Sequence, residues 1–230
     1  MRAHIVVAVD GLAASGKSTI AKAVAVELGM NYYDTGRLYR AVGQRLLELG
    51  RDGHDADVAA QVAQEIDATA LRADGLNSEA VARVGSVAAG HPEVRAALLN
   101  QQRAWCQSVP DGCAGVVLDG RDIGSVVCPD ADLKLYVRAD LEVRAMRRAV
   151  QIGRVAHAEE IAAQLASRDE RDAAIPGVQR PDAVGVVVVD TTSGSLLDIL
   201  RAVAALVRAR AEAPQPAARC KTRRGTTIAI

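Results

Sequence analysis

The chain is 230 residues long and half of them are hydrophobic, which suffices for one α/β domain with a buried core. Its 28 basic and 28 acidic residues give a formal net charge of zero, which excludes a general electrostatic attraction to DNA or to a membrane surface. Aromatic residues make up only 2%, which argues against stacking on single-stranded nucleic acid. The sequence has no 18-residue apolar run and no cysteines at metal-ligand spacing, so we expect a cytoplasmic protein with reduced thiols.

Apolar, β-branched runs alternate along the chain with longer stretches of helical period. The first run, His4–Asp10, predicts a buried strand, and the stretch after it predicts a helix closed by Gly29. A short strand near Tyr32 leads into a helix between Thr35 and Gly50. The later elements expected in chain order are helices over residues 56–66, from about Asn77 and from Pro92, strands at Gly115–Gly120 and Leu133–Val137, helices from Asp140 and over residues 158–173, a strand at Val184–Asp190 and a helix from Ser195.

This alternation predicts a mostly parallel sheet with helices on both faces. In such a sheet, ligands bind outside the carboxyl ends of the strands. Residues 213–230 have no periodicity and contain two prolines and four basic residues, so we expect a disordered tail after a domain over residues 1–212.

The segment GLAASGKS, Gly11–Ser18, lies between the first strand and the first helix and matches the phosphate-loop pattern G-x-x-x-x-G-K-[ST]. Its glycines let successive backbone N–H groups turn toward a phosphate, and the start of the helix adds the positive end of its dipole. Lys17 would place a cation on the β- and γ-phosphates of ATP, and the Ser18 hydroxyl is a ligand for Mg²⁺. The expected ATP-binding residues are Gly11, Leu12, Ala13, Ala14, Ser15, Gly16, Lys17, Ser18 and Thr19.

Arginines at the ends of elements indicate what receives the phosphate. Phosphoryl transfer between two anions needs cations that offset their repulsion and stabilise the charge on the moving group. Arg binds phosphate in a bidentate manner that Lys cannot reproduce. The chain has no N-K-x-D motif, so a GTPase is not expected. The arginines concerned are Arg37, Arg40, Arg95, Arg121, Arg147, Arg148, Arg154, Arg168 and Arg171.

Five further motifs follow the phosphate loop in the order DTGRLYR (34–40), SVAAGHPEVR (86–95), VVLDGRDIG (116–124), SRDERD (167–172) and VVVDTTSGS (187–195). Together they resemble the bacterial cytidylate kinase family from about Val6 to Leu206. The phosphate loop is shared by a huge superfamily, whereas D-G-R-D-[IM]-G and D-[ST]-G-x-x-Y-R are far more specific. The resemblance implies a P-loop NTPase three-layer α/β sandwich with a five-stranded, mostly parallel sheet, an acceptor-binding insert over about residues 56–110 and a short lid over about residues 147–160.

The family activity implied is phosphoryl transfer from ATP to CMP or dCMP, giving CDP or dCDP, by a monomer with Mg²⁺. Arg95 and Asp122 would face the cytosine, and a carboxylate there disfavours uracil, which has an oxygen in place of the amine. The acceptor residues implied are Arg40 and Arg121 for the α-phosphate, Ser86, Arg168 and Asp172 for the sugar, and Thr35 to orient the phosphate end. The catalytic residues implied are Lys17, Arg121, Arg147, Arg148 and Arg154, with Asp119 near the Mg²⁺ through a water molecule.

Two departures from the family pattern concern the acceptor. Ile175 stands where the family usually has a further phosphate-binding Arg, so either Arg171 or Arg180 substitutes or affinity falls by about 1.5–3 kcal/mol. The stretch Ile66–Val81 is also shorter than the family equivalent and predicts a single loop, which leaves a more open acceptor pocket. Two alternatives therefore stay open: a related kinase with another monophosphate or hydroxyl acceptor, and a non-catalytic nucleotide-binding regulator.

Overall fold

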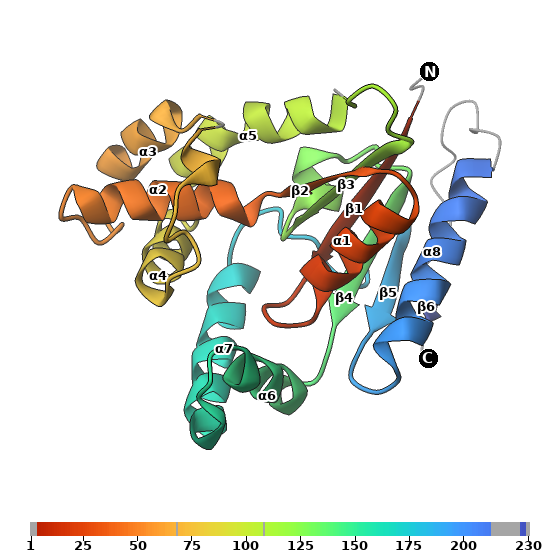
Figure 1. Ribbon diagram of the computed structural model, residues 1–230. Coiled ribbons are helices and arrows are strands. Elements are labelled where there is room, and N and C mark those ends of the chain that lie inside the picture. The colour runs from red at the N-terminus through yellow and green to blue at the C-terminus, as the bar shows by residue number, and fades with distance from the viewer. Residues whose placement is uncertain (1–3, 68, 108, 213–225, 229–230) are drawn as a thin grey trace. The chain divides into compact units, whose positions relative to one another are not determined.

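The computed structural model describes residues 4–67, 69–107, 109–212 and 226–228, which fall into two compact units. The first unit takes its described residues from Met1–Tyr33 and Ser108–Ile230, and the second unit is Asp34–Gln107 (Figure 1). The second unit thus contains the predicted acceptor insert except its last residues, together with the helix that precedes it.

The strands form one sheet in the order β2-β3-β1-β4-β5-β6. The pairs β1–β3, β1–β4, β4–β5 and β5–β6 are parallel, so the carboxyl ends of these strands lie at one edge. The first five strands reproduce the predicted five-stranded α/β sheet. The strands are β1 (Ile5–Gly11), β2 (Asn31–Asp34), β3 (Gly115–Gly120), β4 (Leu133–Arg138), β5 (Val186–Asp190) and β6 (Thr226–Ile228).

Strand β6 was not predicted, because its residues fall in the expected disordered tail. That prediction is wrong for Thr226–Ile228, which pair in parallel with β5. The Thr-Thr-Ile sequence has high strand propensity, and β5 offers an edge to which a short strand can add. Residues 213–225 and 229–230 lie outside the described residues.

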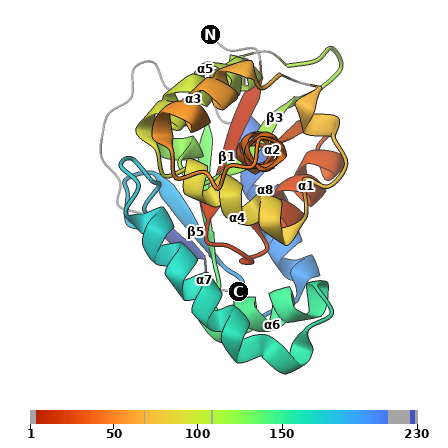
Figure 2. The same ribbon diagram turned by 90° about the vertical axis from the view of Figure 1, so that its left-hand side faces the viewer.

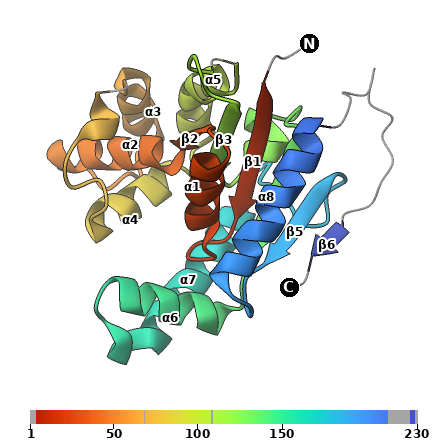
Figure 3. The ribbon, with the colours of Figure 1, turned by 45° about the vertical axis from the view of Figure 1, so that its right-hand side comes forward.

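Two pairs of helices complete the first unit. The helices α1 (Lys17–Glu27) and α8 (Leu196–Glu212) cover one face of the sheet (Figure 3) and share a core cluster with strands β1, β3, β4 and β5. The helices α6 (Leu141–Gln151) and α7 (Ala158–Ala173) lie side by side (Figure 2) and pack through a cluster that includes Ala13 of the phosphate loop. The short helices η2 (Ile123–Val127) and η3 (Val155–His157) follow β3 and α6.

The second unit consists of helices α2 (Gly36–Glu48), α3 (Ala56–Glu65), α4 (Glu79–Ala88) and α5 (Pro92–Gln107), with the single turn η1 (Ala70–Arg72). A separate core cluster joins α2, α3, α4 and α5, and Trp105 packs against it. The backbones of α2 and α4 approach closely at Gly43 and Gly85, where no side chain intervenes. The described residues between 66 and 81 contain η1, turns and the start of α4 but no strand, in agreement with the expectation of a loop in place of a strand pair.

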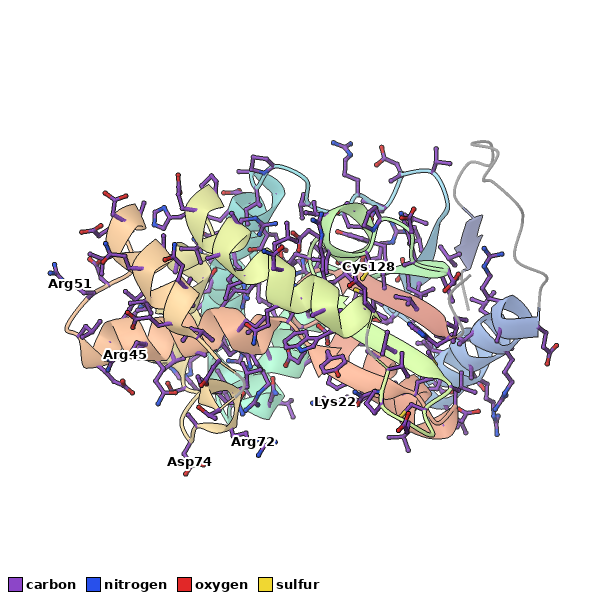
Figure 4. The ribbon with its side chains drawn as sticks, turned by 90° about the horizontal axis from the view of Figure 1, so that it is seen from above. Lys22, Arg45, Arg51, Arg72, Asp74 and Cys128 are labelled. Atoms are coloured by element: carbon purple, nitrogen blue, oxygen red, sulfur yellow. The ribbon has the colours of Figure 1, made fainter. Side chains whose placement is uncertain are left out.

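Cysteine status differs in part from the sequence prediction. Cys113 has a free thiol, whereas Cys106 and Cys128 are disulfide-bonded, so the expectation of reduced thiols is wrong for these two residues (Cys128 is labelled in Figure 4). A buried cysteine behaves in composition and spacing like any small apolar residue, so the sequence carries no sign of the bond. No helix among the described residues is long and apolar enough to cross a membrane.

Candidate active site

The phosphate loop has the conformation that its glycines require. A Cβ atom on Gly11 would collide with the Val137 carbonyl of β4, and Gly11 has a φ of +146°. Gly16 has a φ of +88° and is the N-cap of α1, so the chain turns sharply into the helix. Lys17 and Ser18 are then the first two residues of α1, beside the N–H groups at the positive end of its dipole.

Three carbonyl groups of the loop are held by hydrogen bonds from side chains. The Ser15 hydroxyl donates to the Leu12 carbonyl at 2.9 Å. The Ser15 carbonyl accepts from the Thr191 hydroxyl at 2.8 Å. The Ala13 carbonyl accepts from Arg144 Nη1 at 3.3 Å. The sequence predicted neither contact, although Thr191 lies in the motif VVVDTTSGS, because each residue lies more than 130 residues from its partner in the loop.

Asp119 is the next-to-last residue of β3 and is buried. Its Oδ2 accepts a hydrogen bond from the Tyr32 hydroxyl at 2.9 Å, and Lys22 Nζ lies 5.4 Å from the centre of the Tyr32 ring (Figure 4). The Asp119 carboxylate and the Ser18 hydroxyl are hard oxygen groups, which Mg²⁺ prefers. They fit an ion held mainly by nucleotide phosphates, which is the usual way proteins bind Mg²⁺.

Arg121 follows β3 and is bound to Asp172 of α7. Its Nε donates to Asp172 Oδ2 at 2.7 Å, and its Nη1 donates to the Gly120 carbonyl at 3.3 Å. Burial alone would lower the pKa of Arg121, but the carboxylates of Asp172, Asp119 and Asp169 together raise it. Arg168 Nε lies 3.9 Å from the same Asp172 oxygen. The structure therefore brings two predicted acceptor arginines to the carboxylate of a third predicted acceptor residue, Asp172.

Asp10, the residue before the phosphate loop, is tied to the segment after Arg121. Its two carboxylate oxygens accept hydrogen bonds from the N–H groups of Ile123 and Gly124, each at 2.8 Å. Asp10 is fully buried, and Asp122 beside it is 6% exposed. One sequence feature of Asp10 was not used in the prediction: it is an acidic residue near the end of an otherwise apolar strand.

The three predicted lid arginines have different partners. Arg147 donates to the Thr191 hydroxyl at 2.9 Å and to the Thr191 carbonyl at 2.6 Å, so it is linked to the phosphate loop through that residue. Arg148 donates to Gln151 at 2.9 Å. Arg154 pairs with Glu160 at 3.2 Å. The last two contacts are exposed and lie within the lid segment and the start of α7.

The remaining acceptor candidates lie in the second unit. Thr35 is buried at the start of α2, where its side chain makes no capping hydrogen bond. Arg40 donates to the Asn77 side chain at 2.9 Å. Ser86 follows Gly85, whose backbone lies against Arg40, and Arg95 lies on α5.

The two candidates to compensate for Ile175 also have partners. Arg171 donates to the Ser167 hydroxyl at 2.8 Å within α7. Arg180 pairs with Asp182 at 3.1 Å, and both side chains are largely exposed. An exposed ion pair contributes little free energy, so an anionic ligand could replace Asp182 as the partner of Arg180 at small cost.

Comparisons with known proteins show the family to which the chain belongs. A model of the family described as cytidylate kinase matches residues 7–209. The cytidylate kinase of Rhodospirillum rubrum is 41% identical over 191 residues, covering 82% of this chain and 90% of that protein. The cytidylate kinase of Rhodopseudomonas palustris is 45% identical over 186 residues, covering 78% and 86%. A solved gluconokinase structure from Sinorhizobium meliloti matches with a TM-score of 0.50 and 15% identity, covering 92% and 96%, and supports the fold alone.

Proposed function

The chain belongs to the cytidylate kinase family, and on that premise we propose how its residues phosphorylate CMP and dCMP. The family implies ATP as the donor, so the products are ADP with CDP or dCDP. One observation carries the residue assignment. Asp10 pairs with Gly120 in parallel register, so the phosphate loop and Arg121 leave adjacent strands at the same edge of the sheet. Neighbouring strands lie about 4.8 Å apart, a separation suited to two phosphates that must react.

Each charged group has a distinct task in this proposal. The loop N–H groups and Lys17 bind the donor phosphates and stabilise charge on the transferred group. Arg121 binds the α-phosphate of the acceptor and reduces its repulsion with ATP. No general base is needed, because the acceptor phosphate is already ionised and positioning carries the rate. Ser18 directly and Asp119 through a water molecule would hold Mg²⁺, which would offset the negative charge of the donor phosphates.

The remaining assignments follow the family motifs. Asp122 accepts a hydrogen bond from the cytosine amine, and Arg95 donates to the acceptor atoms of the ring. Arg168 and Asp172 contact the sugar together with Ser86. This assignment requires that one carboxylate oxygen of Asp172 accepts from Arg121 while the other accepts from the sugar. Arg40 and Thr35 complete the phosphate end, and Arg147, Arg148 and Arg154 close over ATP. Following the family, we propose that the protein acts as a cytoplasmic monomer in pyrimidine nucleotide metabolism.

The test of the proposal is ADP release from Mg·ATP with CMP, dCMP, UMP, AMP, GMP and shikimate as acceptors. We expect turnover with CMP and dCMP well above that with the other acceptors. Lys17→Ala should abolish it while circular dichroism shows a folded protein, because the cation on the transferred phosphate is lost. A preference for another acceptor would replace the substrate assignment. Silence across the panel with ATP still bound would favour a nucleotide-binding regulator.

A further inference from the structure

Arg144 of α6 is a buried arginine that holds the Ala13 carbonyl of the phosphate loop and has no task in the proposed reaction. It is 4% exposed and makes three contacts with separate parts of the first unit. Its Nε donates to the Ala139 carbonyl at 3.0 Å. Its Nη1 pairs with Asp169 Oδ2 of α7 at 2.7 Å and donates to the Ala13 carbonyl at 3.3 Å. One guanidinium therefore joins the phosphate loop, the start of α6 and the helix that carries Arg168 and Asp172.

The contact with Ala13 fixes the direction of one peptide group in the phosphate loop. A trans peptide is planar, and its C=O and N–H bonds point to opposite sides. Because the Ala13 carbonyl points at Arg144, the N–H of Ala14 points away from Arg144. Ala14 has a φ of +58°, which is unfavourable for a residue with a side chain and must be held by its surroundings.

A contribution to stability alone does not explain this arrangement. Desolvating an arginine and a carboxylate offsets most of their mutual attraction, so a buried pair is weak evidence for a stabilising role. The planar guanidinium group donates to several acceptors in fixed directions, so it is suited to holding those acceptors in a defined geometry.

We propose that Arg144, held by Asp169, is a positioning residue that keeps the Ala13–Ala14 peptide turned so that the Ala14 N–H faces the donor phosphates. The inference rests on the proposed function in one respect, that the loop binds the phosphates of ATP. The inference predicts that substitution of Arg144 weakens binding of ATP specifically, since the acceptor residues do not depend on the Ala13–Ala14 peptide.

The experiment compares Arg144→Lys and Arg144→Met with a matched control, Arg208→Met. Arg208 is also an arginine of the first unit paired with a carboxylate, Glu27 at 2.7 Å, but this pair is exposed. The measurements are KM for ATP, KM for CMP, kcat, the affinity for a non-hydrolysable ATP analogue by calorimetry, and the urea midpoint. Lys keeps a charge beside Asp169 but cannot reproduce the planar guanidinium group, so it separates charge pairing from positioning.

We expect both Arg144 variants to raise KM for ATP by about tenfold, with a similar loss of analogue affinity and much smaller changes in KM for CMP and kcat. The Lys variant should keep most of the wild-type urea midpoint, and Arg208→Met should match the wild type in every kinetic constant. Unchanged analogue affinity in the folded Lys variant would overturn the inference. If the wild type fails to phosphorylate CMP, the proposed function fails, whereas the analogue titration still decides the role of Arg144.

Discussion

Asp10 is buried, although the charged form of its carboxyl group is more stable in water. Burial at the end of β1 removes its carboxyl from water and raises its pKa from 3.8 to about 7. The N–H groups of Gly124 and Ile123 oppose this rise. Of the nearby charges, Asp122 adds to the rise and Arg121 opposes it. The carboxylate that joins the donor and acceptor segments is therefore ionised at a cost in folding free energy.

The sign of the resulting pH dependence follows from proton binding. The folded-state pKa lies above the unfolded-state value, so the folded protein binds more protons than the unfolded chain between about pH 4 and pH 7. The contribution of Asp10 to the free energy of unfolding is therefore greatest below this range and is lost as the pH rises through it. Tyr136 of β4 is electrostatically coupled to Asp10, and its pKa is raised, chiefly by burial, so it remains neutral over this range.

Asp10→Asn removes this titration. The free energy of unfolding of the variant relative to the wild type should rise by roughly 1–3 kcal/mol between about pH 5 and pH 8. Urea unfolding at the two pH values measures the difference. The control is Asp182→Asn, because Asp182 is exposed and its pKa is lowered by Arg180, which places its titration below this range. A pH-independent difference for Asp10→Asn would contradict the assignment.

At the scale of single residues, the sequence was sufficient to predict those residues whose role is set by a local motif. Lys17 and Ser18 could be assigned because a phosphate loop is a continuous segment between a strand and a helix. The partners of Arg121 could be assigned only as a set of family positions, and the direct bond to Asp172 was not foreseen. Thr191 and Arg144 were missed because their contacts join distant segments, and a single sequence contains no signal for such pairs.

At the scale of elements, the contact between α2 and α4 is set by two glycines. A Cβ atom on Gly43 would lie 2.5 Å from the Gly85 nitrogen and 2.6 Å from the Val81 carbonyl oxygen. Both are backbone atoms of a helix and cannot move aside individually. The helices can therefore pack at this separation only without side chains at these positions.

Gly43→Ala should lower the free energy of unfolding by about 1–3 kcal/mol, because overpacking exceeds the gain in helix propensity. Urea unfolding followed by circular dichroism measures the change. The control is Gly36→Ala, where the nearest atom to the new Cβ is the Asp34 carboxylate oxygen at 3.0 Å, the mobile end of a side chain. A Gly43→Ala protein as stable as the control would show that the two helices separate easily.

Most elements could be predicted because their periodicity is local. The predicted helix over residues 158–173 coincides with α7, and Ser195 precedes α8, where its hydroxyl accepts from the Asp198 N–H at 3.1 Å. Periodicity identifies a helix face but not its partner. The division into two units, the grouping of α2 to α5 and the added strand β6 all depend on tertiary contacts that no local pattern encodes.

At the scale of the whole molecule, the residues proposed to bind the two substrates are distributed unequally between the two units. All the residues assigned to ATP lie in the first unit. The residues proposed for the acceptor come from both units: Arg121, Asp122, Arg168 and Asp172 belong to the first, and Thr35, Arg40, Ser86 and Arg95 belong to the second. Donor and acceptor should therefore affect the second unit to different extents.

Trp105 gives the second unit an optical reporter of its own. The chain has one Trp and no Phe, so indole emission comes from α5 alone. CMP should shift or quench this emission, whereas Mg·ATP alone should leave it unchanged. Arg95→Gln should abolish the response to CMP, while Arg103→Gln, on the same helix but outside the assigned residues, should retain it. An equal response to ATP alone would argue against this division of the substrates. A core almost free of aromatic rings thus provides fluorescence from a single site, and acceptor binding becomes observable without any attached dye.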